Sequence, residues 1–503
     1  MRCKKYIKPL LYLALISAII FTTPVSFFYS KVDEYTDILY WIGSVYTISS
    51  LTFVIVESLL TILTSLVRYC RKRQQVVWNV ETHKYQTMTT KDITLINEVK
   101  EVIITSLPNG SVPVSRFDGE NTTVVRPPDP TVLILLCAHL EASQDTILDT
   151  LTALRDIHAK NDTVHVVVAH DAHEFKIREN LIRRIDEFHA MYMTRGKALT
   201  RIECQSESRA DAIYHVSKLI VESKLPRSNY IAILDAEQRP ERYTLIRALD
   251  ILTTKDVDIL QGRCIIRNTQ CWLGALAAVE FDLLYAMHHK GGEVIRGDNT
   301  FGNSNCWMTM ATFLDVGVRR EMICDDLDMC LRASMMGYDV CYNSNVVIYE
   351  PAPDTVKKLW LQRVKWARGW FQVAISTLTR ILACTKKGPS LSVRWFLFQL
   401  IIYHEIFYYP SAQVLPILLS SLAKSAYKLN FYIFLSSCVT LLILPVQMII
   451  VKFHLKLDVD RIAPDDYHPV SWKMYLIYFL LSPVYTYFKF LCYVFGHIQE
   501  LSL

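Results

Sequence analysis

The sequence predicts an α/β domain held between α-helical transmembrane segments, and three observations lead to this fold class. The chain of 503 residues is 51% hydrophobic and 20% charged, with a mean hydropathy of +0.20, which is too apolar for an ordinary soluble enzyme. Long apolar runs lie near both ends. Between them, short apolar runs alternate with helical patterns, which is typical of a mostly parallel α/β sheet.

The N-terminal part, residues 1–75, is predicted to form two transmembrane helices. Its apolar runs span about Leu10–Tyr29 and Ile38–Val67, and each can cross a bilayer core of about 30 Å. Basic residues precede the first run and follow the second at Arg68–Arg73. Because basic flanks mark the cytosolic side of a membrane, we expect the next segment to be cytosolic.

Residues 76–355 are predicted to form this cytosolic domain, with buried strands at Thr131–Cys137, Val164–Ala169 and Tyr230–Leu234. Lys, Arg and Trp alternate with apolar residues over Val356–Leu382, which predicts amphipathic interfacial helices within residues 356–390. Further apolar runs in residues 391–503 predict about three C-terminal transmembrane helices.

Charge and cysteine usage exclude two classes of partner. The formal net charge is only +5, and the basic residues cluster beside apolar runs. This pattern argues against nucleic acid and favours the lipid bilayer as a partner. The 13 cysteines show neither a C-x-x-C pair nor a spacing suited to zinc.

Two carboxylates, Asp235 and Glu237, follow the predicted strand Tyr230–Leu234. At the carboxyl end of a parallel strand, such a pair can share a hard divalent cation with substrate phosphates. An exposed turn can carry the same pattern without binding a metal.

A second acidic cluster, Asp325, Asp326 and Asp328, precedes an amphipathic helix that Gly337 is expected to end. One of these carboxylates could take a proton from an acceptor hydroxyl. Acidic residues at a helix N-terminus are also ordinary caps, an alternative that suits Asp328 best.

A third cluster, Gln362–Trp370, combines cationic and aromatic residues. Its Arg and Lys side chains could hold a diphosphate, and its Trp rings could stack on a sugar. Interfacial anchoring in a membrane is the alternative.

Together, and in this order, the three clusters resemble the D-x-D, E-D-D/T-E-D and Q-x-x-R-W motifs of the processive family-2 glycosyltransferases, which include cellulose, hyaluronan and chitin synthases. Phe301–Asn305 resembles the acceptor loop of that family, and Ser208–Ala212 lies where it usually has K-A-G-A/N-L. The resemblance covers about Thr131 to Gln372. It implies a Rossmann-like GT-A fold for the cytosolic domain.

The resemblance also implies a role for each matching residue. It implies catalytic roles for Asp325 and Asp326, donor binding by Asp171, Arg209, Asp235, Gln362, Arg363 and Lys365, acceptor binding by Gly302, Asn303, Trp366 and Arg368, and Mg²⁺ or Mn²⁺ on Asp235 and Glu237. Aligned on its strand, the first motif could instead place His170 at the position of Asp171.

The activity implied is a multi-pass membrane enzyme, in the plasma membrane, that polymerises an extracellular β-linked glycan from a UDP-sugar with inversion. A cellulose-type or hyaluronan-type product fits, and the growing chain would pass through the helices of the enzyme. Glu237, Arg209 and Lys365 depart from the usual Asp, Lys and Arg, so an inactive homologue stays open. Transfer of a single sugar to a lipid is a second alternative. A transporter is a third, although no internal repeat is visible.

Overall fold

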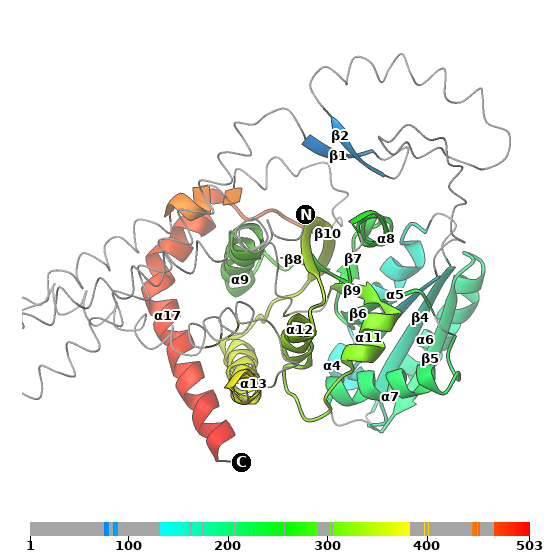
Figure 1. Ribbon diagram of the computed structural model, residues 1–503. Helices are drawn as coiled ribbons and strands as arrows, with labels where there is room; N and C mark the ends of the chain where they lie inside the picture. Colours follow the sequence, from blue (N-terminus) through cyan, green and yellow to red (C-terminus); the bar gives the residue numbers. More distant parts are fainter. Residues whose placement is uncertain are drawn as a thin grey trace, which may run out of the picture.

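The computed structural model describes residues 131–159, 163–173, 176–205, 208–226, 228–255, 257–289, 302, 305–382 and 467–502, the backbone of 75–79 and 84–88, and a few positions between 397 and 452. The predicted N-terminal transmembrane helices and most of 391–466 lie outside the described residues. In Figure 1 the described elements form one body of sheet and helices.

In the described residues, eight strands form one mixed sheet with the order β5-β4-β3-β6-β9-β8-β10-β7. The strands are β3 (Thr131–Ala138), β4 (Thr163–Asp171), β5 (Ala198–Cys204), β6 (Tyr230–Asp235), β7 (Arg239–Pro240), β8 (Ile259–Ile266), β9 (Cys306–Thr309) and β10 (Val340–Glu350). Strands β3 to β6 pair in parallel, as do β8 and β10, whereas β9 and β7 run antiparallel to their neighbours. The three expected strands are therefore confirmed. A separate hairpin joins β1 (Gln75–Asn79) to β2 (Lys84–Met88).

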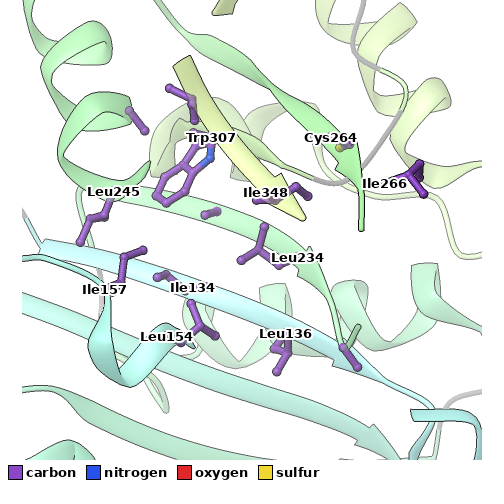
Figure 2. Packing of buried hydrophobic residues seen from close by; sticks show 14 of the residues in the cluster. Ile134, Leu136, Leu154, Ile157, Leu234, Leu245, Cys264, Ile266, Trp307 and Ile348 are labelled. Atoms are coloured by element: carbon purple, nitrogen blue, oxygen red, sulfur yellow. The ribbon is translucent and has the colours of Figure 1, made fainter. Parts of the chain in front are cut away.

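Both faces of the sheet are covered, which explains why its central strands are continuous apolar runs. In β3, the side chains of Val132, Ile134 and Leu136 belong to one core cluster, whereas those of Leu133 and Leu135 belong to the other. Figure 2 shows Ile134 and Leu136 beside Leu234 of β6 in the first cluster. Because β4 and β6 both pair in parallel with β3, the carboxyl ends of these three strands emerge together at one edge of the sheet.

Helices form the two outer layers. They are α4 (Leu140–Ser143), α5 (Ile147–Asp156), α6 (Arg178–Met193), α7 (Arg209–Val221), α8 (Thr244–Lys255), α9 (Trp272–Leu283), the π-helix η1 (Leu284–His289), α11 (Met310–Val316), α12 (Asp325–Met336), α13 (Val356–Leu382) and α17 (Trp472–Leu501). Helices α5, α6, α8 and α9 pack on one face of the sheet, and α7, α11 and α12 pack on the other.

The bounds of the helices that carry the second and third motifs agree with the prediction. Helix α12 ends at Gly337, which has a φ of +89°, a conformation that favours glycine. Helix α13 spans the predicted Val356–Leu382. Helix α17 packs against α13 and α9 (Figure 1). In the described part of the chain, it is the one helix long and apolar enough to cross a membrane by length and composition.

Candidate active site

The first motif is a turn that the buried side chain of Gln238 holds in place. Strand β6 ends at Asp235, whose carbonyl accepts a hydrogen bond from the backbone N–H of Gln238 at 3.0 Å. The amide oxygen of Gln238 accepts from the Asp235 N–H at 3.0 Å, and its Nε2 donates to Glu350 of β10 at 2.6 Å. Sequence reasoning missed Gln238 and Glu350, although Gln238 directly follows the D-x-E triplet.

Arg209 joins the first motif to the second. The hydroxyl of Ser208 caps α7 by accepting from the Asp211 N–H, which places Arg209 in the first turn. Its Nε donates to Oδ1 of Asp235 at 2.7 Å, and its NH1 donates to Oδ2 of Asp325 at 2.5 Å. Burial disfavours the guanidinium charge, but the two carboxylates raise the pKa of Arg209 well above its ordinary value. The planar fork of arginine suits this bridge in a way that lysine does not.

Asp326 carries the electrostatics of a general base. It is half-buried in the first turn of α12, and its Oδ1 accepts from the Leu327 N–H at 2.8 Å. Burial and the negative charge of Asp325 raise the pKa of Asp326 to about 6, although Arg209 opposes this rise. A carboxyl group with this pKa is mostly ionised at neutral pH yet close enough to it to accept a proton efficiently.

Glu237, in the first motif, is influenced by the charge of a lysine in the third motif. Its side chain reaches solvent, although protein surrounds it on most sides. The resulting loss of hydration and the charge of Asp235 raise the pKa of Glu237 to about 7, while Arg209 and Lys365 oppose the rise. Lys365 is an exposed lysine of α13, and its charge thus acts on the D-x-E turn.

The predicted donor residue Asp171 lies at the end of β4, two strands from Asp235 in the sheet. Its Oδ1 accepts from the Leu140 N–H at 2.9 Å, and His139 lies 3.4 Å from its Oδ2. His170, the alternative, is fully buried, with its ring between the Asp171 carbonyl at 2.7 Å and Arg201 at 3.1 Å. Both ring nitrogens of His170 are therefore engaged within the protein, which favours Asp171 for ligand binding.

Two arginines of the third motif pair with glutamates of α9 and α17 rather than with the carboxylates of the first two motifs. Arg363 is buried and donates to Glu280 of α9 at 2.7 Å. Arg368 donates to Glu500 of α17 at 3.2 Å. The donor role of Arg363 and the acceptor role of Arg368 stay predictions.

Trp366 and Gln362 complete the predicted residues of α13, and both are half-buried. The guanidinium of Arg363 lies over the Trp366 ring, 4.3 Å from its centroid. This ring therefore has a fixed neighbour on one side.

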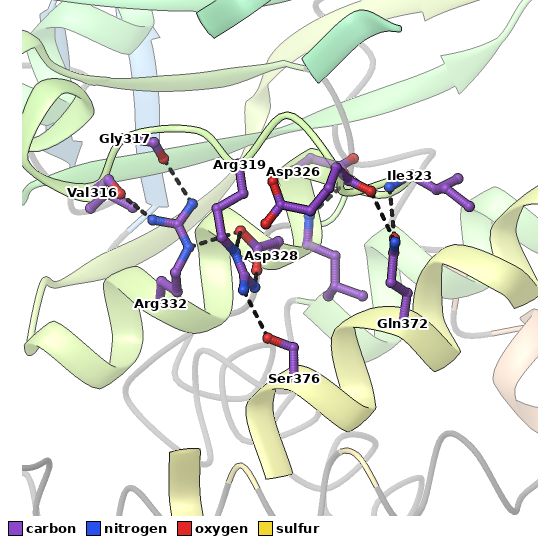
Figure 3. A network of polar contacts seen from close by, with 11 residues as sticks. Val316, Gly317, Arg319, Ile323, Asp326, Asp328, Arg332, Gln372 and Ser376 are labelled. Carbon is purple, nitrogen blue, oxygen red and sulfur yellow. Dashed lines mark hydrogen bonds and ion pairs between the residues drawn. The ribbon is translucent and has the colours of Figure 1, made fainter. Parts of the chain in front are cut away.

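Helix α13 closes tightly on the start of α12. A Cβ added to Gly369 would stand 2.2 Å from Sγ of Cys324, so this glycine permits the close approach. Gln372 accepts from the Ile323 N–H and donates to the Glu321 carbonyl, each at 2.9 Å (Figure 3). These contacts hold the loop that leads into Asp325 and Asp326.

Asp328 has a structural role, as expected, but it does not act as a helix cap. Figure 3 shows it between Arg319 and Arg332. Nε of Arg319 donates to Asp328 at 3.0 Å, and Nε of Arg332 donates to it at 2.8 Å. NH1 of Arg319 also donates to Ser376 at 2.8 Å, which ties α12 to α13.

The predicted acceptor loop reaches the same helix. Gly302 is exposed, and a Cβ built on it would lie 4.0 Å from Leu327 of α12. Asn303 lies outside the described residues. Asn305 is fully buried with a φ of +68°, which asparagine tolerates better than most residues. It donates to the carbonyls of Arg263 and Val346, so it anchors the loop to the sheet.

Asp235 and Glu237 suit a divalent cation by their chemistry, since both offer carboxylate oxygens. Within the described residues, no group of three or more His, Cys, Asp or Glu side chains is arranged to hold a metal. Asp235 and Glu237 would supply two oxygen ligands beside those of phosphates and water, a pattern typical of Mg²⁺ bound with a nucleotide.

Comparison with known proteins gives matches over this region. A sequence model of the glycosyl transferase family group 2 matches residues 230–494, slightly more than half of the chain. A probable glucomannan 4-beta-mannosyltransferase 7 of Oryza sativa subsp. japonica is 27% identical over 143 residues, 28% of this chain and 24% of that protein. A poly-beta-1,6-N-acetyl-D-glucosamine synthase of Staphylococcus epidermidis is 25% identical over 135 residues, 27% and 32% of the two chains. The matches thus span a third or less of either relative.

Among solved structures, a mannosyltransferase of Pyrobaculum calidifontis in complex with GDP-Man and Mn²⁺ is 15% identical to this chain. The superposition has a TM-score of 0.44 and covers 82% of this chain and 95% of that one.

Proposed function

The chain belongs to the glycosyl transferase family group 2, and on this premise we propose that it is a membrane enzyme that extends a β-linked glycan from a nucleotide-sugar with inversion. One observation carries the proposal. Arg209 bridges Asp235 and Asp325, so that the end of a GT-A-like α/β sheet and the start of α12 form one acidic site.

The reaction follows from the position and charge of these groups. Asp326 would take the proton of an acceptor hydroxyl as its oxygen attacks the anomeric carbon of the donor. The bond to the diphosphate breaks, and the nucleoside diphosphate leaves with the bonding electrons. Lys365, near Glu237, would offset the charge of that leaving group. Asp171 would bind the nucleobase at the end of β4.

Asp235 and Glu237 would hold Mg²⁺ or Mn²⁺, which when bound neutralises part of the diphosphate charge. Arg209 balances the charge of one of these carboxylates, Asp235. The site thus combines carboxylates for a cation with positive side chains for phosphates, which suits a donor that binds as a complex of diphosphate and cation.

The polymerase reading rests on the third motif and on the relatives. Trp366 would bind the acceptor, as the resemblance of the third motif implies, and the names of both relatives denote transfer to β-linked glycans. The apolar runs support a multi-pass enzyme in the plasma membrane with a cytosolic catalytic domain. A growing chain held at Trp366 would then leave through the membrane part.

The test is incorporation of radiolabelled sugar by membranes that contain the full chain. UDP-glucose, UDP-GlcNAc, a mixture of UDP-GlcNAc and UDP-GlcA, and GDP-mannose are supplied separately with Mg²⁺ or Mn²⁺. We expect a high-mass product from one condition, and a loss of about 10²- to 10⁴-fold in Asp326→Asn. Asp186→Asn, which changes an exposed carboxylate of α6, is the matched control and should keep full activity.

Other outcomes decide between the alternatives. A low-mass product that extracts with lipid would replace polymerisation by single transfer. Absence of incorporation, together with absence of nucleotide-sugar binding, would indicate an inactive homologue and overturn the proposal.

A further inference from the structure

A partly buried carboxylate outside the acidic site receives three donors. Glu280, on α9, accepts from Arg363 of α13 at 2.7 Å, from the Tyr485 hydroxyl of α17 at 2.7 Å and from Lys489 of α17 at 3.2 Å. Burial opposes its ionisation, but Arg363 and Lys489 outweigh burial and hold the pKa of Glu280 at about 2. Glu280 is therefore a fixed anion at the meeting point of three helices.

This anion determines how Arg363 is oriented. The guanidinium is almost fully buried, and its NH2 group contacts both Glu280 and, at 3.3 Å, the Tyr485 hydroxyl. The same guanidinium lies over the ring of Trp366 at 4.3 Å, the distance of a cation–π contact. Because Glu280 holds one edge of the Arg363 guanidinium, the orientation of the guanidinium plane is fixed. The indole ring of Trp366, which lies against that plane, is restrained in turn.

The surrounding packing makes the restraint rigid. A Cβ added to Gly496 of α17 would stand 2.8 Å from the Cβ of Ala367, the residue next to Trp366. The rings of Phe371 and His497 stack with centroids 4.5 Å apart. Helix α17 therefore fits closely on the segment of α13 that carries Trp366.

We propose that Glu280 is a positioning residue of the acceptor site, which fixes the ring of Trp366 through Arg363, and that Tyr485 and Lys489 make α17 a part of this device. The inference rests on the proposed function, because Trp366 binds the acceptor only in that proposal. It gives Arg363 a role toward the acceptor side rather than toward the donor diphosphate.

Helix α9 offers a matched control two residues further on. Asp282 is buried, and like Glu280 it accepts from a cation and from a tyrosine of α17, namely from Arg263 at 2.7 Å and from Tyr475 at 2.7 Å. Its cation belongs to β8, whereas that of Glu280 belongs to α13. Asp282→Asn thus removes a comparable charge without touching the Arg363–Trp366 pair.

The experiment compares Glu280→Gln, Asp282→Asn and the native full chain in membranes. Each receives the radiolabelled donor, among the four named above, that supports incorporation. Sugar incorporated per nucleoside diphosphate released is measured with product length and the KM for the donor. In Glu280→Gln we expect this ratio to fall about tenfold or more, with shorter products, because water captures glycosyl groups that a misplaced acceptor misses. The donor KM should not change.

A purely structural role gives a different result. Loss of folded protein lowers release and incorporation in proportion, so the ratio and product length stay constant, as we expect for Asp282→Asn. The same constancy in Glu280→Gln would overturn the inference. If Glu280→Gln fails to fold, Lys489→Met keeps the carboxylate and should lower the ratio by a smaller factor; an unchanged ratio there would also overturn it. No nucleotide release from any donor by the native chain would overturn the proposed function itself.

Discussion

The two sides of the site are built by different means. On the proposed donor side, Asp171 and Asp235 stand at the ends of β4 and β6, which both pair in parallel with β3 between them, so backbone pairing sets their positions. On the acceptor side, Trp366 lies on a helix, and its surroundings depend on side-chain contacts with Glu280 and α17.

The difference shows where the site can vary. A sheet fixes its strand ends through many hydrogen bonds, so single substitutions on the donor side should change chemistry more than geometry. Helices joined by a few ion pairs can shift when one pair is lost. We therefore expect substitutions on the acceptor side to change geometry before they change chemistry.

The largest effect is expected at Arg209, where the two sides meet. Arg209→Ala leaves the carboxylates of Asp235 and Asp325 close together without their shared cation. Loss of the cation from this partly buried pair costs about 1 to 3 kcal/mol of the free energy of unfolding, and we expect activity to fall at least about a hundredfold. Denaturant unfolding and sugar incorporation measure the two losses.

Arg209→Lys and Arg155→Ala complete this test. Lysine keeps the charge but not the fork, so Arg209→Lys should fall between the native chain and Arg209→Ala. The pair of Arg155 with Asp156 is more exposed, and its loss should cost less than about 1 kcal/mol. Equal losses in Arg209→Ala and Arg155→Ala would contradict the bridge.

The pH dependence of activity should report Asp326. Its pKa is raised to about 6, and its ionised form is the base, so activity should fall about tenfold for each pH unit below 6. Glu280, with a pKa of about 2, stays ionised over this range and should not contribute. Nucleotide release between pH 4.5 and 8 gives the profile. It is measured at saturating divalent cation, which as a ligand partner would keep Glu237, with its pKa of about 7, ionised over this range.

A fall in activity that begins only near pH 4, rather than near pH 6, would contradict the assignment of Asp326 as the base. The fall near pH 6 should also disappear from the residual activity of Asp326→Asn, whereas Asp186→Asn should retain it.

Gly369→Ala tests the acceptor side through its geometry. The added Cβ would stand 2.2 Å from Sγ of Cys324, so α13 must move away from α12 at a cost of about 1 to 3 kcal/mol. We expect a lower ratio of incorporation to nucleotide release. The double variant Gly369→Ala with Cys324→Ala should recover part of both losses; if it recovers neither, this contact is not the cause.

Gly337→Ala should have the smallest effect. This glycine ends α12 with a φ of +89°, and a Cβ there would meet nothing within 4 Å, so the cost is conformational, at about 1 kcal/mol. Thermal unfolding should detect it, with incorporation per folded molecule unchanged. Loss of incorporation in Gly337→Ala would show that the positions of Asp325 and Asp326, at the start of α12, depend on how the helix ends.

The strand ends that carry Asp171 and Asp235 were largely predictable from the sequence, because they depend on local patterns. Buried apolar runs locate β3, β4 and β6, and the residues that follow them must emerge at one edge. The period of α13 likewise gave its bounds. The acceptor side depends on pairs that are 83 residues apart for Glu280 and Arg363 and 132 apart for Arg368 and Glu500. Nothing in a single sequence distinguishes these carboxylates from the many exposed ones.

The role of Asp328 illustrates the same limit. Its place in the first turn of α12 suggested a cap, a local role. Its partners Arg319 and Arg332 lie on either side of it in the sequence. Arg332 is one helical turn away on α12, but the contact with Arg319 depends on the path of the turn after α11, which the sequence does not reveal.

The contact between Glu280 and Lys489 has a consequence for how the enzyme matures. These residues lie 209 positions apart, and the ribosome adds about 5 to 20 residues per second. Lys489 follows Trp366 by 123 residues. For roughly 6 to 25 s, therefore, a nascent chain has made its carboxylates and Trp366 but not the helix that steadies the ring. During synthesis, the ability to bind a donor should arise before the ability to elongate a glycan.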